Sequence, residues 1–370
     1  MRTTLGVEEE FVLLDPVTLT PVARAADAVT ALGGPRREGG AVTQEFFPSQ
    51  LEYATPVCDT AAEASEALEQ FRRALRAWAS DAGLLAAGVG LPYRTAHVAQ
   101  VTDEERYRDI ASRFGLVVPD HQLNGLHVHV GVGDRDEAIV ALNRLRPWLP
   151  ALLALSANSP FWRAEDTGFD SWRAIHSRRW TTHGIPPAFL DAADYDRRAG
   201  ALSGIGGTVD AGTLNWVVRP SERYPTVEVR VFDAQLDGVT STALAALVRG
   251  LVTTPPEGDV DLLPLSPELL DAAHWHAARD GLGGELVNPL DGRLRPAPEV
   301  VEALLAQARP GLVEHGDASL VAAAVARLLS DGNGATRQRR ALAQGGTSGL
   351  ADLVSGSADA MHGRDDGASA

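Results

Sequence analysis

The sequence predicts an α+β domain in which helices stack on one face of an antiparallel sheet. Strand-like alternation of apolar and polar residues is concentrated before residue 240, whereas the chain beyond Thr240 is mostly alanine- and leucine-rich with helical spacing. This separation of strands from helices favours an α+β arrangement over a regularly alternating parallel one. With 370 residues, of which 45% are hydrophobic, the chain can bury a substantial core.

Individual elements follow from their periodicity. Strands are expected at residues 4–15, 45–57, 83–91, 127–132 and 226–235. Helices are expected at residues 60–83 and 103–114, in a segment that begins near residue 134, and over most of the chain beyond residue 240. In the first helix, Leu68, Phe71, Leu75 and Trp78 recur at the spacing of one helical face.

The middle of the chain, residues 158–214, is rich in Gly, Pro and Arg and has little periodicity. A long irregular stretch between regular flanks is typical of binding loops. We expect one catalytic domain over residues 1–354 and a disordered, solvated tail over residues 355–370.

Charge and composition limit the partners. A net charge of −16 argues against nucleic acid or an anionic membrane as a partner, and favours small molecules and metals. The single cysteine, Cys58, excludes an internal disulfide and suits a reducing compartment, and the acidic N-terminus does not resemble a secretory signal, so a cytoplasmic location is expected. The apolar stretch at residues 148–157 is about half the length of a membrane span and predicts a buried helix. Whether the chain forms a homodimer is left open.

No lysine occurs in the chain, so all 33 basic residues are arginines. This excludes a phosphate-binding loop ending in Gly-Lys-Ser/Thr, a Schiff-base lysine and a carbamylated-lysine metal bridge. The nucleophile-elbow, Cys-x-x-Cys and zinc-protease helix motifs are also missing.

Three predicted strands share one design, a polar pair at positions i and i+2 that is backed by apolar residues. The pairs are Glu8 and Glu10, His127 and His129, and Glu228 and Arg230. Because side chains alternate along a strand, each pair lies on one face, whereas Glu9 lies on the opposite face. Carboxylates about 6 to 7 Å apart on a strand can coordinate neighbouring divalent ions.

Glu45 and Glu52, from a neighbouring segment, add further carboxylates to this polar face. The alternative is that one face of an antiparallel sheet simply meets water. A solvated face usually mixes lysine, threonine, serine and glutamine, so the joint pattern of carboxylates, imidazoles and one arginine favours a functional face. Carboxylate-rich ligand sets favour magnesium or manganese over zinc.

The sequence allows two interpretations of His127, His129, Trp162 and Trp172, and one of Cys58. His127 and His129, considered alone, fit either hydrogen-bonded histidines on a half-buried strand or a metal or phosphate site. Trp162 and Trp172 fit either a pocket wall or the core. Cys58 has no evident activating base and is expected to be a buried structural thiol.

Six segments together resemble the carboxylate–amine ligases that are similar to glutamate–cysteine ligase of the second, bacterial type. They are GVEEEF, QLEYATPV, NGLHVHVGV, ANSPFW, DTGFDSWR and PTVEVRVFD, within residues 6–237. The resemblance implies a glutamine synthetase-like catalytic fold, in which a curved antiparallel sheet forms a cup with helices on its outer face. ATP and magnesium would lie on the concave face.

The same resemblance implies roles for individual residues. The expected metal ligands are Glu8, Glu10, Glu45, Glu52, His127 and Glu228. Arg230 and Glu228 match the Glu-x-Arg pair that serves metal and phosphate, His127 would contribute to the nucleotide site, and the match of His129 is weaker.

The implied activity is ATP-driven amide formation through an acyl phosphate, with glutamate and cysteine as the expected substrates. From the sequence, Arg173 could hold a carboxylate or phosphate through a bidentate contact. Arg178 and Arg179 could do the same, or could be solvated at the surface. Two other functions compete with the ligase: a metallohydrolase that uses His127 and His129, and a non-catalytic protein that binds nucleotide or amino acid.

Overall fold

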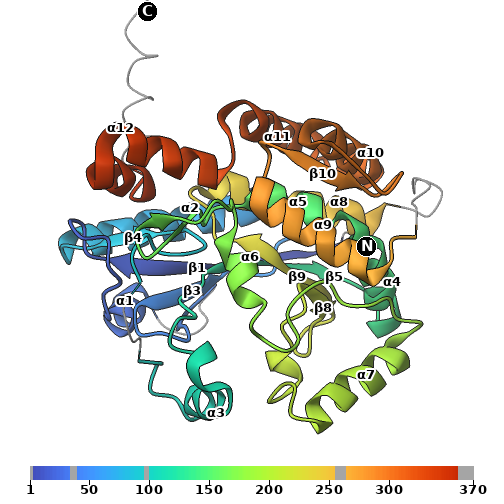
Figure 1. Ribbon diagram of the computed structural model, residues 1–370, viewed down its shortest axis with the longest axis horizontal. Coiled ribbons are helices and arrows are strands. Elements are labelled where there is room, and N and C mark those ends of the chain that lie inside the picture. Colours follow the sequence, from blue (N-terminus) through green and yellow to red (C-terminus); the bar gives the residue numbers. More distant parts are fainter. Residues whose placement is uncertain (1–2, 34–39, 96–99, 255–263, 357–370) are drawn as a thin grey trace, which may run out of the picture.

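The computed structural model describes residues 3–33, 40–95, 100–254 and 264–356, so the predicted tail lies outside the described residues except for Ser355 and Gly356. Its central feature is a seven-stranded antiparallel sheet with the strand order β2-β3-β1-β5-β9-β8, and β4 pairs with β1 (Figure 1). The strands are β1 (Leu5–Leu14), β2 (Ala41–Gln44), β3 (Gln50–Ala54), β4 (Leu85–Ala87), β5 (Gly125–Gly131), β8 (Val218–Pro220) and β9 (Thr226–Asp233). The antiparallel sheet expected from the sequence is therefore confirmed.

Helices α2, α5 and α8 pack directly against this sheet, and α9, α10 and α11 form a further layer outside them (Figure 1). Two helices, α3 and α7, lie on the other side of the sheet (Figure 1), so the prediction of helices on one face holds for most of them. The helices are α1 (Ala25–Leu32), α2 (Ala61–Asp81), α3 (Glu105–Phe114), α4 (Arg135–Leu145), α5 (Leu149–Ser156), α6 (Trp172–Ser177), α7 (Ala192–Gly204), α8 (Gly238–Thr253), α9 (Pro267–Asp280), α10 (Ala297–His315), α11 (Ala318–Asp331) and α12 (Gly334–Val354).

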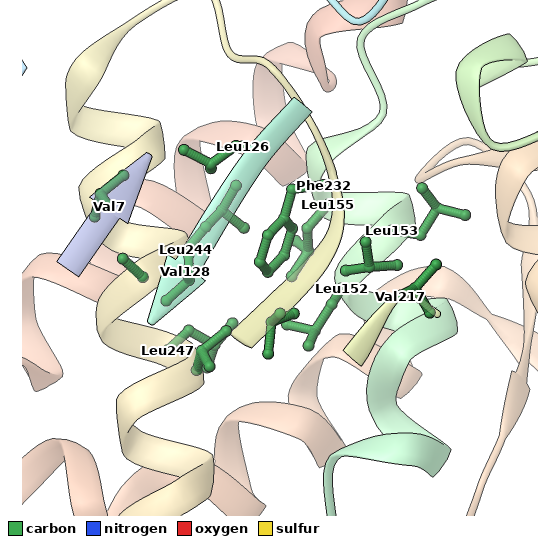
Figure 2. Close-up of a cluster of buried hydrophobic side chains, with 14 of the residues drawn as sticks. Val7, Leu126, Val128, Leu152, Leu153, Leu155, Val217, Phe232, Leu244 and Leu247 are labelled. Carbon is green, nitrogen blue, oxygen red and sulfur yellow. The ribbon is translucent and has the colours of Figure 1, made fainter. Parts of the chain in front are cut away.

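The main core lies between the apolar face of the sheet and helices α5 and α8. Figure 2 shows Val128 and Phe232 of the sheet beside Leu152 of α5 and Leu244 and Leu247 of α8. These side chains are at most 2% exposed. Burial of the apolar face fixes the register of each strand, because a shift by one residue would move the polar pairs into the core.

Polar caps set several helix starts. Thr60 accepts a hydrogen bond from the backbone N–H of Glu63, whose side chain accepts one from Thr60 in return, so α2 begins with a capping box. Asp134 accepts from the backbone N–H of Glu137 and caps α4. Both helices begin where the sequence predicts.

The run Arg135–Ser156 joins α4 to α5 and is long and apolar enough to suit a membrane span, the single such run in the described ranges. Within the protein, 72% of its most apolar window is buried, and all of α5 is buried. The prediction of a buried helix at residues 148–157 is thus confirmed.

Several elements were not predicted from the sequence: α1, α6 and α7, and strands β2, β6 (Phe161–Trp162), β7 (Glu165–Asp166), β8, β10 (Glu285–Asn288) and β11 (Arg293–Pro296). Helix α7 lies inside the stretch expected to be irregular, and only Asp194, Tyr195 and Ala199 of it are buried, which leaves a weak periodic signal. The hairpins β6 with β7, and β10 with β11, are too short to produce a clear alternation.

Glu9 lies on the apolar side of β1, as its position in the alternation predicts, and is fully buried. Arg72 of α2 donates to both of its oxygens, at 2.9 and 2.5 Å, and the Ser241 hydroxyl donates to it at 2.7 Å. Arg72 also donates to the carbonyl oxygens of Gln235 and Leu236. This buried ion pair therefore joins β1, α2 and the turn before α8.

Candidate active site

A cavity of about 360 Å³ lies over the polar face of the sheet and contains all three predicted polar pairs. Its lining includes Glu8 and Glu10 of β1, Glu52 of β3, His127 and His129 of β5, Glu228 and Arg230 of β9, and Glu45, which follows β2. The prediction that these side chains converge on one face of the sheet is confirmed.

Strand register brings the polar residues into cross-strand pairs. Glu10 is opposite Glu52, and Glu8 is opposite His127. His129 is opposite Glu228. Directly opposed residues on neighbouring strands have Cβ atoms about 4.5 to 5.5 Å apart, so the acidic and imidazole groups are held close together by the backbone itself.

Three overlapping groups of side chains could each hold a metal ion. They are Glu8 with His129 and Glu228, Glu8 with Glu52 and His127, and Glu10 with Glu45 and Glu52. Within each group, one ligand atom from every residue lies within 4.8 Å of the others. Because Glu8 and Glu52 are shared, the cavity could hold neighbouring ions bridged by carboxylates.

Crowding and burial perturb the carboxyl groups strongly. Burial, reinforced by the charge of Glu45, raises the pKa of Glu10 to about 8. Burial and the neighbouring Glu8 raise the pKa of Glu52 well above its ordinary value, and burial also raises the pKa of Glu45. Burial opposes ionisation of Glu8 as well, but its contacts with the two histidines outweigh burial and lower its pKa.

The two histidines are suited to different contacts. Burial and the nearby Arg230 lower the pKa of His127 to about 4, so its ring is neutral at physiological pH and has a lone pair for a cation. The Nδ1 atom of His129 lies 2.9 Å from the Thr226 hydroxyl. Its buried Nε2 atom has no hydrogen-bond partner among the described residues and lies 3.5 Å from a Glu8 oxygen.

Glu228 is held between two arginines. Arg230 forms an ion pair with it through Nη1, and Arg219 of β8 donates to it from Nε at 2.8 Å and from Nη2 at 3.3 Å. Burial disfavours the charged carboxylate, but the two guanidinium groups outweigh burial and hold the pKa of Glu228 well below its usual range. The pKa of Arg230 is raised in return, so Arg230 is a fixed cation beside the acidic cluster.

The contact of Arg219 with Glu228 was not predicted from the sequence. Arg219 lies directly opposite Glu228 in the register of β8 and β9, but β8 has only three residues and its alternation is too short to detect. Arg219 also donates to the carbonyl oxygens of Gly212 and Leu214 at 2.9 and 2.8 Å. It therefore ties the irregular stretch to the sheet.

Arg173 of α6 lines the cavity, whereas Arg178 and Arg179 are absent from its lining. Arg178 instead donates to Asp271 at 2.7 Å. Arg179 contacts His176 and donates to the carbonyl oxygen of Val117 at 3.2 Å. Of Arg173, Arg178 and Arg179, the structure therefore brings Arg173 alone to the site, where it joins Arg230.

An aromatic and aliphatic wall completes the cavity and was missed from the sequence. It consists of Phe46, Tyr107, Ile110, Phe114 and Trp180. Three of these residues belong to α3, whose apolar positions are those of any amphipathic helix. Trp162 and Trp172, which fitted either a pocket wall or the core, do not line the cavity; their rings contact His176 and Phe169 in tilted arrangements.

Cys58 is buried, and burial raises the pKa of its thiol. Its sulfur donates to the carbonyl oxygen of Pro56 at 3.2 Å. The prediction of a structural thiol is therefore supported.

Comparison with known proteins identifies the family. The family model for glutamate–cysteine ligase family 2 matches residues 4–359. Two relatives carry the name "Putative glutamate–cysteine ligase 2" followed by a paralogue number. The relative from Mycolicibacterium vanbaalenii is 45% identical over 349 residues, and the relative from Saccharopolyspora erythraea is 44% identical over 338 residues. Each alignment covers 91% of this chain, and they cover 93% and 89% of the respective relatives.

Solved structures share the fold at low sequence identity. The glutamate–cysteine ligase of Francisella tularensis in complex with AMP has a TM-score of 0.69 and 13% identity, with 96% of this chain and 88% of that chain covered. A bifunctional glutathione synthetase from Pasteurella multocida has a TM-score of 0.65 and 15% identity, with 95% of this chain and 52% of that chain covered. With nearly the whole sequence matched by one family model, this chain belongs to glutamate–cysteine ligase family 2.

Proposed function

We propose that this protein is an ATP-dependent carboxylate–amine ligase that joins the γ-carboxylate of glutamate to the amine of cysteine through an acyl phosphate. The observation that carries this function is the convergence of five glutamates (Glu8, Glu10, Glu45, Glu52 and Glu228), His127, His129 and Arg230 in one cavity of a family 2 chain. The AMP complex of the Francisella ligase supports the use of a nucleotide. The family gives no support to a metallohydrolase or to a purely nucleotide-binding protein.

The side chains of the cavity fit magnesium, with manganese as an alternative. The ligand set is mostly carboxylate oxygen, which magnesium and manganese prefer. The raised pKa values of Glu10 and Glu52 indicate that the surrounding protein would not neutralise the negative charge of these carboxylates. The proposed ligands are Glu8, Glu10, Glu45, Glu52, His127 and Glu228. When bound, the cation would neutralise and align the phosphates of ATP.

In the first step, an oxygen of the glutamate γ-carboxylate attacks the γ-phosphorus, the bond from that phosphorus to the bridging oxygen breaks, and ADP leaves. In the second step, the amine attacks the acyl carbon and loses a proton, and inorganic phosphate leaves. Arg230 would stabilise the charge on the phosphoryl oxygens during the first step. Glu228 would hold Arg230 in position through their ion pair.

The shape of the site is part of this proposal. The sheet would form the floor of a cup, with α3 and the segments around Arg173 and Trp180 as its rim, since the cavity is lined from all of these. The catalytic domain would extend over residues 1–354. A homodimer remains a prediction that light scattering coupled to gel filtration can check.

The decisive experiment measures phosphate release from ATP with a panel of amino acids, with magnesium present or removed by chelation. We expect release only when glutamate, an amine and magnesium are all present, with formation of γ-glutamylcysteine when the amine is cysteine. Release with water alone would indicate a hydrolase. ATP binding without release in any combination would indicate a binding protein.

A further inference from the structure

Asp233, the last residue of β9, lies beside the cavity and has no role in the chemistry described above. It is fully buried. Its Oδ2 atom accepts hydrogen bonds from the backbone N–H of Asn158 at 2.8 Å and from the Ser159 hydroxyl at 2.7 Å. Its Oδ1 atom accepts from the Ser171 hydroxyl at 2.9 Å. The segments ANSPFW and DTGFDSWR therefore meet at one carboxylate.

Both serine hydroxyls also accept hydrogen bonds from backbone N–H groups of α6. The Ser159 oxygen accepts from the backbone N–H of Arg173 at 3.0 Å. The Ser171 oxygen accepts from the backbone N–H of Ala174 at 3.2 Å, which caps the helix. Because each hydroxyl has one proton and donates it to Asp233, its oxygen is left to accept from the helix. Asp233 thus fixes the first turn of α6 on which Arg173 lies.

The Arg173 guanidinium is buried, but nearby carboxylates neutralise its positive charge only weakly. Its side chain is 12% exposed, and the nearest carboxylate oxygen in the described residues is Asp233 Oδ1, 3.7 Å away. Its hydrogen bonds to the carbonyl oxygens of Arg230 and Val231 are long, at 3.3 and 3.5 Å. By contrast, Arg219 has a carboxylate oxygen of Glu228 at 2.8 Å. Of these two buried cations, Arg173 is the one with capacity for an anionic ligand.

A glycine leaves room for this arrangement. A Cβ atom on Gly125 would lie 2.6 Å from Nη2 of Arg173 and 3.1 Å from Nε2 of His127. The backbone N–H of the same glycine donates to Glu10 at 2.6 Å. The guanidinium therefore passes over Gly125 at the edge of the acidic cluster and lines the cavity that an amino-acid substrate would enter.

We infer that Asp233, through Ser159 and Ser171, is a positioning residue that holds Arg173 as the receptor for the non-reacting carboxylate of the amino-acid substrate. This inference rests on the proposed ligase function for the identity of the substrate. It assigns binding of the amino acid to Arg173 and binding of the nucleotide to the metal ligands and Arg230. A substitution at one of these places should therefore change the affinity for one substrate and leave the affinity for the other unchanged.

The test compares Asp233→Asn, the milder Ser171→Ala and Arg173→Ala in the full-length protein. Steady-state kinetics gives KM for glutamate and for ATP, and calorimetry gives the Kd of L-glutamate without turnover. Asp237→Asn is the matched control, because Asp237 also caps a helix and pairs with arginines, Arg327 and Arg337, but does not line the cavity.

We expect Asp233→Asn to raise KM and Kd for glutamate roughly tenfold or more, by analogy with the loss in metal affinity when the hydrogen-bond partner of a metal ligand is removed. KM for ATP should not change, Ser171→Ala should show a smaller shift in the same direction, and Asp237→Asn should lower Tm without altering glutamate affinity. In an Arg173→Ala background, Asp233→Asn should have no further effect on glutamate affinity, because the two residues act as one unit.

Unchanged glutamate affinity in both Asp233→Asn and Ser171→Ala would overturn the inference. An equal loss of ATP affinity would overturn the assignment of a carboxylate to Arg173, and multiplicative effects of the two substitutions would show that Asp233 does not act through Arg173. The Kd measurement keeps the two proposals separate. A wild-type protein that binds glutamate through this unit without ligating it would refute only the proposed function.

Discussion

Substitution of Arg230 by lysine distinguishes an arginine that stabilises the transition state of phosphoryl transfer from one that only binds the nucleotide. Lysine keeps the positive charge but loses the planar fork that matches phosphoryl oxygens. The structure also predicts that the fold survives this change. Arg219 still donates to Glu228 at 2.8 and 3.3 Å, so the buried carboxylate is not left uncompensated.

The expected magnitudes follow from these contacts. Loss of one hydrogen-bonding contact to a carboxylate that keeps its second arginine should lower the free energy of unfolding by about 1 kcal/mol. Loss of one preorganised donor at the transition state should raise the barrier by about 3 to 4 kcal/mol. At about 1.4 kcal/mol per factor of ten, the rate of phosphoryl transfer should fall by roughly 10² to 10³.

The assay combines rapid-quench single turnover, in which the acyl phosphate is trapped with hydroxylamine, with equilibrium titration of ATP. We expect the rate of acyl-phosphate formation to fall much further than ATP affinity. Arg295→Lys is the control, since Arg295 pairs with Asp291 on a hairpin remote from the cavity lining, and neither quantity should change. Equal losses of rate and affinity in Arg230→Lys would make Arg230 a ground-state phosphate clamp and would refute its transition-state role.

Three further predictions concern the acidic cluster and the ion pair behind it. Glu52→Gln should abolish magnesium-dependent turnover with little change in Tm, because the side chain faces the cavity and its loss leaves no void in the core; unaltered magnesium dependence would remove Glu52 from the site. Since the pKa of Glu10 is about 8 and that of Glu52 is also raised, the folded metal-free protein binds more protons than the unfolded chain, so the free energy of unfolding should fall as pH rises from about 7 to about 8. Excess magnesium should reverse this fall in the free energy of unfolding, and its binding should release protons. Calorimetry in two buffers of different ionisation enthalpy would detect the released protons. A free energy of unfolding that rises between about pH 7 and about pH 8 would contradict the raised pKa values. Arg72→Met should lower the free energy of unfolding by about 3 to 5 kcal/mol, measured by urea denaturation, because it leaves Glu9 buried and unpaired; Glu9→Leu combined with it should recover most of that loss.

Strand alternation was enough to predict which residues share the polar face. The period of two is a property of the backbone, and one buried face fixes it. The pairs on β1, β5 and β9 therefore lie on one face, and Glu9 lies on the other, as the sequence indicates. This part of the site depends on local geometry alone.

Contacts between distant segments could not be predicted in this way. The register that places Glu10 opposite Glu52 joins strands between which the chain forms α1 and β2. A register shift between Leu126 and Val128 on β5 occurs at His127 itself, and no local pattern specifies such an irregularity. Arg219 and the wall provided by α3 are brought in by tertiary packing, so their residues look ordinary in the sequence.

The three consecutive glutamates of β1 differ in how the protein compensates their charge, and this difference separates structural from functional roles. Glu9 is matched by the bidentate contact of Arg72 and by the Ser241 hydroxyl, so its charge is neutralised within the fold. Glu10 accepts from the backbone N–H of Gly125 at 2.6 Å, yet burial and its acidic neighbour still raise its pKa to about 8. Ionised carboxylates crowded in this way destabilise a protein unless a cation joins them. The charge of Glu9 is thus neutralised by Arg72 within the fold, whereas Glu10 is neutralised by a proton or, under the proposed function, by a bound cation.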